Sequence, residues 1–198
     1  MALEVSSDMI WLGLGGYLAG SVPFGIICAY LAGLGDIRKI GSGNIGATNV
    51  LRSGNKLAAF GTLVGDAGKG ALAVGLVIMA GYEDHAAFVG LMAVIGHCYP
   101  VWLRFQGGKG VATTLATLAV IYWPAGLAMA LCWLVMSLIF KISSLSALAG
   151  FAVATIISAL YFDDWLYVAL ISCLCYWRHR ENIKRILAGT ESRISFKK

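Results

Sequence analysis

Four polar segments of this chain carry the side chains that could do chemistry, and apolar stretches separate them. The first segment, residues 41–52, is rich in glycine, serine, threonine and asparagine and ends in arginine. Glycines let successive backbone N–H groups converge on one anion, and the planar arginine fork matches phosphate. The segment is therefore predicted to bind phosphate, with a flexible loop between two helices as the alternative. Its candidate ligands are Gly41, Ser42, Gly43, Asn44, Gly46, Thr48, Asn49 and Arg52.

The other three segments add donors of the same kind. Residues 107–110 place Lys109 in a glycine-rich turn that opens a helix, where unpaired N–H groups favour an anion. A lysine that extends from the membrane interface to water is the alternative. Ser144 lies in a pair of serines, and His179 and Asn182 are three residues apart on one predicted helix face. All of these side chains are suited to holding phosphate groups.

Two nucleotide-binding motifs are excluded by their context. The spacing of Gly41, Gly43 and Gly46 matches G-x-G-x-x-G, but that motif binds a dinucleotide only inside a βαβ unit, and here it follows an apolar helix. A P-loop needs a glycine five residues before the one that precedes Lys109, and a serine or threonine directly after the lysine. Leu103 and Gly110 occupy those two places.

The four segments lack a carboxylate pair, a histidine-rich metal set and a nucleophile–His–Asp arrangement. They therefore predict a substrate that is already activated and heavily anionic, handled without a metal or a cofactor. Asp66 and Lys69 lie inside an apolar stretch and are three residues apart, so they are predicted to pair on one helix face. For His97, a structural hydrogen bond and a catalytic role remain equally open.

The elements that must position these residues are membrane helices. Of the 198 residues, 59% are hydrophobic and 13% are charged, whereas a soluble domain carries about 25% charged residues. A soluble globular domain is thereby excluded. The predicted fold is an all-α polytopic integral membrane protein. Its predicted spans cover residues 9–35, 58–80, 86–103, 111–123, 125–140, 147–162 and 165–177, and a short interfacial helix is predicted within 178–188.

Pro124 and the charge distribution set the number of spans. The apolar stretch 110–140 is too long for one span of a hydrocarbon core about 30 Å thick, and proline breaks helices, so two helices that turn at 123–126 are predicted. With seven spans, all 15 Lys and Arg residues fall on one side. The positive-inside rule then predicts about seven transmembrane helices, with the N-terminus outside and the C-terminus cytoplasmic. The basic charge thus indicates a membrane surface and no nucleic-acid partner.

Taken together, these segments resemble one known family, the bacterial acyl-phosphate-dependent glycerol-3-phosphate acyltransferases of the PlsY type. The resemblance covers essentially the whole chain. It is carried by GSVPFG at 20–25, GSGNIGATNVLR at 41–52, GGKGVAT at 107–113 and RHREN at 178–182. No single block is specific for the family, but the four blocks together, in this order and on one membrane face, are specific.

The resemblance implies a single membrane acyltransferase domain, residues 1–198, in the bacterial inner membrane with a cytoplasmic active site. It implies transfer of a fatty acyl group from acyl phosphate to the 1-hydroxyl of sn-glycerol 3-phosphate. The products would be lysophosphatidic acid (1-acyl-glycerol 3-phosphate) and phosphate, in the first step of phospholipid biosynthesis. The expected partners are these substrates and the bilayer; the oligomeric state stays open, a monomer included.

The same resemblance assigns roles to individual residues. Ser42, Arg52, His179 and Asn182 would be catalytic, Lys109 would belong to the glycerol-phosphate-binding segment, and Ser144 would contact substrate. Because acyl phosphate is a mixed anhydride with a good leaving group, positioning and charge stabilisation would carry the catalysis. The proton of the hydroxyl would go to His179 or, as slightly preferred here, to a substrate phosphate.

Two other classes of membrane protein fit the sequence less well. A transporter of a phosphate compound needs polar groups at mid-membrane depth and access from both sides, whereas these donors lie on one face. A phosphatidyl-alcohol-transferring enzyme needs clustered aspartates for a divalent metal, and the inner face offers Asp36 and Asp66. The acyltransferase is therefore preferred.

Overall fold

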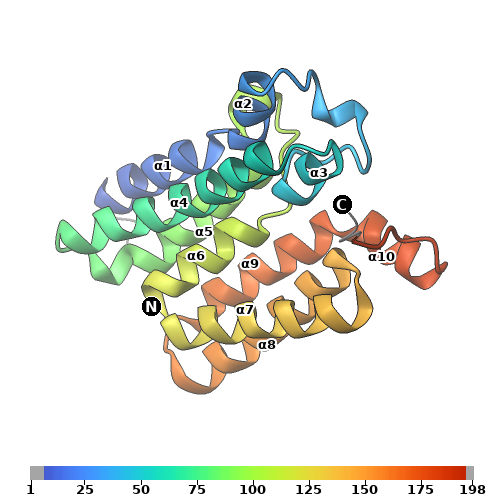
Figure 1. Cartoon of the computed structure of the whole chain (residues 1–198). Coiled ribbons are helices and arrows are strands. Elements are labelled where there is room, and N and C mark those ends of the chain that lie inside the picture. Colours follow the sequence, from blue (N-terminus) through green and yellow to red (C-terminus); the bar gives the residue numbers. More distant parts are fainter. Residues whose placement is uncertain (1–6, 195–198) are drawn as a thin grey trace.

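The computed structural model describes residues 7–194, which form helices and no strand. The long helices run side by side as a bundle, with the short helices α2, α3 and α10 toward one end (Figure 1). The α-helices are α1 (Ser7–Ser21), α2 (Phe24–Leu31), α3 (Ala47–Arg52), α4 (Lys56–Met79), α5 (Ala86–Cys98), α6 (Val111–Ile121), α7 (Trp123–Phe140), α8 (Ser143–Tyr161), α9 (Trp165–Arg178) and α10 (Arg180–Leu187). Three short 3₁₀ turns are η1 (Ile37–Lys39), η2 (Glu83–His85) and η3 (Val101–Leu103).

Five of the described helical stretches are long and apolar enough to cross a membrane. They are Ser7–Leu31, Lys56–Met79, Glu83–Leu103, Trp123–Phe140 and Ser143–Tyr161, and α6 and α9 are shorter apolar helices. Large apolar side chains cover the outside of the bundle, among them Leu72, Leu138 and Leu160. A helix that is apolar on its outer as well as its inner face suits a lipid environment.

Two apolar stretches that contain a proline are each divided into two helices, and the sequence predicted only one of these divisions. The stretch 9–35 was predicted as one span, but the structure ends α1 at Ser21 and starts α2 at Phe24, because Pro23 cannot continue the helix. The prediction of two helices within 110–140 is confirmed. The predicted turn at 123–126 is wrong: the break lies at Tyr122, and Pro124 sits in the first turn of α7, where its missing N–H costs nothing.

Other boundaries also differ from the prediction. The span predicted for 86–103 ends as an α-helix at Cys98, and the following residues form η3. The span predicted for 147–162 begins at Ser143, so Ser144 lies in the first turn of α8. The short helix predicted within 178–188 is present as α10, which α9 precedes directly.

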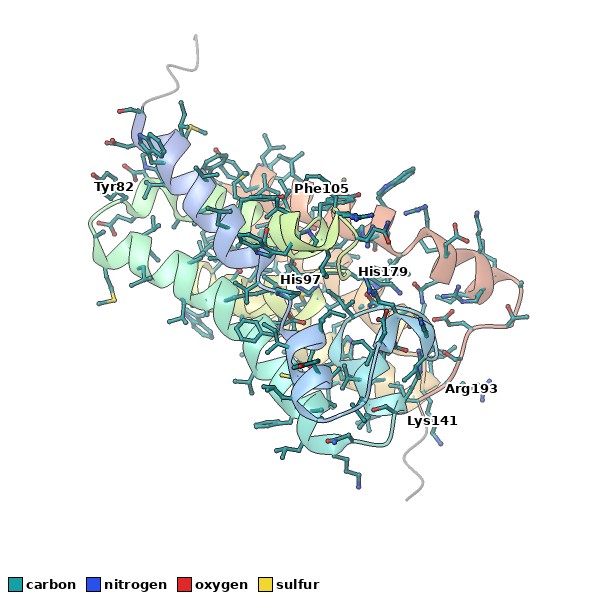
Figure 2. All side chains as sticks on the ribbon, turned by 90° about the horizontal axis from the view of Figure 1, so that it is seen from above. Tyr82, His97, Phe105, Lys141, His179 and Arg193 are labelled. Carbon is teal, nitrogen blue, oxygen red and sulfur yellow. The ribbon has the colours of Figure 1, made fainter. Side chains whose placement is uncertain are left out.

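Two apolar clusters form the core of the described structure. The larger one contains residues of the five helices from α5 through α9, and its Phe151 and Met129 are fully buried. The smaller one buries Ile37, Ile45 and Val50 beneath α2 and the start of α4. Because these three residues flank and interrupt the glycine-rich segment 41–49, their burial fixes that segment to the bundle. Figure 2 shows Tyr82 at one end of the molecule, Lys141 and Arg193 at the other, and His97 and His179 between them.

Helices α1 and α5 approach closely through small residues. A Cβ atom built on Gly20 would lie 2.0 Å from the carbonyl oxygen of Ala93, and one on Gly96 would lie 2.1 Å from that of Tyr17. Small residues at such crossings let two membrane helices pack backbone to backbone.

This contact predicts the effect of adding one methyl group. Gly20→Ala should lower the unfolding free energy in detergent micelles by about 1–3 kcal/mol, because the two backbones must separate. Gly15→Ala is the matched control on the same helix, since a Cβ atom at that position would have nothing within 4 Å, and it should unfold at the wild-type temperature or above. Equal thermal midpoints for the two variants would contradict the close approach.

Candidate active site

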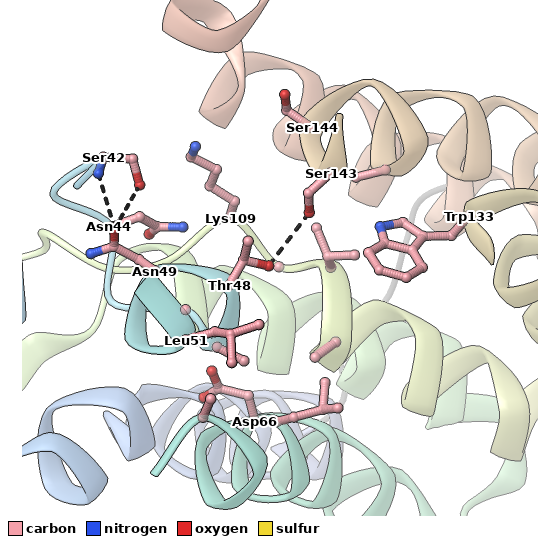
Figure 3. Close-up of a pocket in the computed structure, with 18 of the residues that line it drawn as sticks. Ser42, Asn44, Thr48, Asn49, Leu51, Asp66, Lys109, Trp133, Ser143 and Ser144 are labelled. Atoms are coloured by element: carbon pink, nitrogen blue, oxygen red, sulfur yellow. Dashed lines mark hydrogen bonds between the residues drawn. The ribbon is translucent and has the colours of Figure 1, made fainter. Parts of the chain in front are cut away.

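A cavity of about 710 Å³ lies at the end of the bundle where α3 and α10 are found. Figure 3 shows Lys109 between Ser42 and Ser144, with Asp66 on the far side of Leu51. The structure brings most of the predicted site residues to its wall: Ser42, Asn44, Gly46, Thr48, Asn49, Arg52, Lys109, Ser144, His179 and Asn182. Gly41 lines an adjoining recess. Gly43 lines neither, and its N–H donates to Ile40 in a turn where φ is +70°.

Asn49 organises the glycine-rich segment from inside. Its Oδ1 accepts from the backbone N–H of Ser42 at 2.9 Å and from the Ser42 hydroxyl at 3.3 Å. Its Nδ2 donates to the carbonyls of Ile37 and Ile40, both at 3.0 Å. Two donated and two accepted bonds satisfy the whole amide, and the residue is buried. The side chain predicted to bind substrate therefore holds Ser42 in place.

The lysine-bearing turn is fixed by backbone contacts with α5 and by one arginine. The N–H groups of Gly107 and Gly108 donate to the carbonyls of Cys98 and His97 at 3.1 and 3.0 Å. Arg178 donates to the carbonyls of both glycines, at 2.8 Å from Nη2 and 3.0 Å from Nε. A Cβ on Gly108 would lie 2.0 Å from His97 Nε2. The turn is thus clamped between α5 and α9, and Gly108 leaves room for the imidazole.

Lys109 projects from this turn into the cavity and donates to Asn182 Oδ1. Burial lowers the pKa of Lys109 to about 8; the Glu191 carboxylate opposes this shift, and the cations Arg185, Arg178 and Arg52 act in its direction. An ammonium group that is poorly solvated and has three arginines nearby gains from an anionic ligand. The electrostatics of the site therefore favour a phosphate beside Lys109.

His179 caps the junction between α9 and α10. Its Nδ1 lies 2.7 Å from the carbonyl of Cys175; since a carbonyl can only accept, Nδ1 carries the proton and Nε2 is the acceptor nitrogen. Burial lowers the pKa of His179 to about 4, and the positive charges of Lys109 and Arg178 add to the shift. The ring is therefore neutral near pH 7.

Glu191 is a site residue that the sequence analysis missed. Its Oε1 accepts from Ser144 Oγ at 2.8 Å and from Asn182 Nδ2 at 2.6 Å, and its Oε2 accepts from Arg185 Nε at 2.6 Å. Burial alone would raise the pKa of Glu191, but these hydrogen bonds outweigh it and keep the pKa below its usual value. The carboxylate links α8 to α10, and through Asn182 to Lys109.

The signal for Glu191 in the sequence was weak. A single carboxylate in a basic tail is usually a solvated charge, and its partner Ser144 is far away in the chain. The structure returns the segment after α10 to α8, where the N–H of Ile194 donates to the carbonyl of Lys141 at 2.6 Å. Ser192 in the same segment accepts from Arg52 Nη2 at 2.6 Å.

The predicted pairing of Asp66 with Lys69 is confirmed. Lys69 Nζ donates to Asp66 Oδ1 at 2.8 Å and to the carbonyl of Val22, which precedes Pro23, also at 2.8 Å. His97 Nδ1 lies 3.5 Å from the same carboxylate oxygen, and Asp66 and His97 both line the cavity. All three side chains are buried. The cluster pairs the charge of Lys69 and joins α4 to α5 beside the site.

The rest of the cavity wall is apolar and reaches the surface of the bundle. Phe60 and Leu63 of α4 line the cavity and are also 62% and 47% exposed. Leu115 of α6 and Trp133 of α7 face them from the other helices of the wall. An apolar passage therefore leads from the polar donors to the outer, lipid-suited face of the bundle.

Comparison with known proteins agrees with this geometry. The family model described as glycerol-3-phosphate acyltransferase matches residues 10–189. The chain belongs to this family. Its resemblance to the PlsY type is thereby confirmed, and the chain is an integral membrane acyltransferase.

Individual members of the family show how far the similarity extends. Glycerol-3-phosphate acyltransferases of Paramagnetospirillum magneticum and Roseobacter denitrificans are each 53% identical, and each match covers 96% of this chain and at least 95% of the relative. A crystal structure of PlsY, an integral membrane glycerol 3-phosphate acyltransferase, in its glycerol 3-phosphate form has a TM-score of 0.89 at 34% identity over 96% of both chains. Its lysophosphatidic acid form has a TM-score of 0.87.

The Asn49 contacts predict a local loss of order on an isosteric change. Asn49→Asp replaces the Nδ2 donor by an oxygen that faces the carbonyls of Ile37 and Ile40, which should lower the unfolding free energy by about 1–3 kcal/mol. Hydrogen exchange at the Ser42 amide should accelerate in this variant. Asn44→Asp, the same change at a cavity-facing position, is the control and should leave that exchange rate unchanged. Unaltered Ser42 protection in Asn49→Asp would refute the clamp.

Proposed function

We propose that this protein transfers a fatty acyl group from acyl phosphate to the 1-hydroxyl of sn-glycerol 3-phosphate. The products are lysophosphatidic acid and phosphate, in bacterial phospholipid biosynthesis. One observation carries the proposal: a single cavity joins side chains that are suited to phosphate to an apolar passage that reaches the surface. The acceptor is supported by the names of the relatives and of the similar structures; the donor is supported by the four sequence blocks and by the chemistry below.

The membrane arrangement belongs to the same proposal. The five long apolar stretches, with α6 and α9 as two further crossings, make seven spans. The N-terminus then lies outside, and the C-terminus and the site lie on the cytoplasmic face of the inner membrane. Its support is the charge distribution, since basic residues gather on the cytoplasmic side.

Bond exchange in the proposed reaction needs no covalent intermediate on the protein. The oxygen of the glycerol 1-hydroxyl attacks the carbonyl carbon of acyl phosphate, and the bond from that carbon to the phosphate oxygen breaks. Phosphate leaves with the electron pair of that bond. Arg52 and Lys109 would neutralise the two phosphate groups, while Ser42, held by Asn49, would orient the reacting groups. The acyl chain would lie along Phe60, Leu63 and Trp133.

The proton of the hydroxyl goes to a substrate phosphate in this proposal. A phosphate monoester has a second pKa near 6, whereas burial holds the pKa of His179 at about 4. The phosphate is therefore the stronger base of the two. His179 Nε2 would instead accept a hydrogen bond that orients the hydroxyl.

A donor comparison tests the proposed function. Purified protein is incubated with glycerol 3-phosphate and either palmitoyl phosphate or palmitoyl-CoA, and lysophosphatidic acid is measured. Product is expected from palmitoyl phosphate alone, because the acyl carbonyl of palmitoyl-CoA is bonded to sulfur and has no phosphate directly beside it for the basic residues of the site to bind. A reaction without glycerol 3-phosphate controls for hydrolysis. Absence of product from both donors would overturn the proposal, and product from palmitoyl-CoA would overturn its choice of donor.

The pKa of Lys109 predicts the alkaline side of the pH profile. A lysine with a pKa near 8 is charged below pH 8 and loses its charge as the pH rises through that value, so kcat/KM should fall above about pH 8. On the acid side, kcat/KM should fall below about pH 6 as the phosphate is protonated. Lys109→Arg should remove the alkaline fall, since arginine keeps its charge, although its maximal rate should be lower.

His179→Ala is the comparison for this profile. Because its pKa lies below the assayed range, the variant should be slower while its profile keeps both limbs at the wild-type pH values. Loss of the acid limb in His179→Ala would identify the imidazole as the base. An alkaline limb that persists in Lys109→Arg would show that another group causes it.

A further inference from the structure

A second, smaller recess of about 380 Å³ lies beside the large cavity. Glycine and polar residues make up its wall: Gly41, Ser42, Arg52, Arg185, Thr190 and Ser192. Ser42 and Arg52 line both spaces, so the recess and the cavity are contiguous. Its two arginines come from α3 and α10, which are far apart in the sequence.

Contacts within the protein hold both guanidinium groups at the recess. Arg52 donates from Nη2 to Ser192 Oγ at 2.6 Å. Arg185 donates from Nε to Glu191 Oε2 at 2.6 Å, and the carbonyl of Arg185 accepts from the N–H of Thr190 at 2.8 Å. The Glu191 carboxylate is 5% exposed and is already hydrogen-bonded to Ser144 and Asn182. It therefore anchors one edge of Arg185 and leaves the terminal nitrogens of that side chain for another acceptor.

Gly41 allows Arg52 to lie close to the wall. Its φ is +55°, and a Cβ built there would lie 3.0 Å from Arg52 Cδ and 2.5 Å from Asn49 Oδ1. A larger residue would displace either the arginine or the amide that holds Ser42. The recess thus presents two planar cations and three hydroxyl-bearing side chains.

We propose that Arg185 is a substrate-binding residue that adds a second guanidinium group, at this recess, to the phosphate site that the proposed function gives to Arg52. Planar arginine forks bind phosphate bidentately, and two of them match a dianion. This inference rests on the proposed function, in which each substrate carries one phosphate. The recess has no apolar lining residue, which favours the phosphate of the water-soluble glycerol 3-phosphate. Lys109, which the resemblance assigned to the glycerol-phosphate-binding segment, would then bind acyl phosphate beside the apolar passage.

Arg185→Gln tests the assignment. The variant should raise KM for one of the two substrates by about 10- to 100-fold, the range expected on losing a hydrogen bond to a charged group. A rise for glycerol 3-phosphate identifies its phosphate as the occupant, and a rise for acyl phosphate identifies that one; either result supports the subsite. Lys184→Gln removes the neighbouring, exposed charge on α10 and should leave both KM values at the wild-type level. Unchanged KM values in Arg185→Gln would overturn the proposal.

Two further measurements separate a binding defect from other failures. Arg185→Lys keeps a cation beside Glu191 but lacks the planar fork, so its KM should lie between those of the wild type and Arg185→Gln while its thermal midpoint stays at the wild-type value. Binding of inorganic phosphate, followed by thermal shift, needs no turnover. If the wild type forms no lysophosphatidic acid, the proposed function fails. The subsite fails on its own if phosphate stabilises Arg185→Gln as much as it stabilises the wild type.

Discussion

Backbone N–H and C=O groups that are buried away from water must find hydrogen-bond partners within the protein, because an unpaired buried polar group costs free energy. Helices meet this constraint by themselves, but the irregular segments that form the site do not. Two side chains add partners there: Arg178 donates to the carbonyls of residues 107 and 108, and Asn49 gives a second hydrogen bond to the carbonyls of residues 37 and 40, which already accept from backbone N–H groups. The same contacts fix Ser42 and Lys109. Satisfying the backbone and preorganising the site are therefore one structural solution.

The sequence predicted what depends on local pattern. Apolar stretches marked the helices, and a charge pair three residues apart marked the Asp66–Lys69 bridge. Pro124 correctly indicated two helices, but the predicted position of the break between them was wrong. A proline can sit in the first turn of a helix as well as end the preceding one. Asn49 was predicted to face substrate because its residue type suits an anion; whether an amide points inward or outward is decided by its distant backbone neighbours.

Glu191 and Arg185 escaped prediction for a different reason. Their importance comes from the return of the segment after α10 across the end of the bundle, where Glu191 meets Ser144 of α8. Nothing in the tail itself distinguishes a buried carboxylate from a solvated one. Packing of α8, α9 and α10 creates that contact, so it follows from tertiary structure. The sequence could supply the individual donors, but the bundle decides which of them share a cavity.

Charge balance connects these residues to the proposed chemistry. Burial lowers the pKa of Lys109 to about 8, and nearby arginines act in the same direction. The site therefore holds several positive charges that are poorly solvated. Glu191 relieves part of this excess, and phosphate dianions would relieve the rest. Since Ser42 and Arg52 border both the apolar-walled cavity and the polar recess, two phosphates bound there would bring a hydroxyl and an acyl carbonyl together beside Ser42. Under the proposed chemistry, electrostatic attraction of the substrates and their alignment for attack are then achieved by the same side chains.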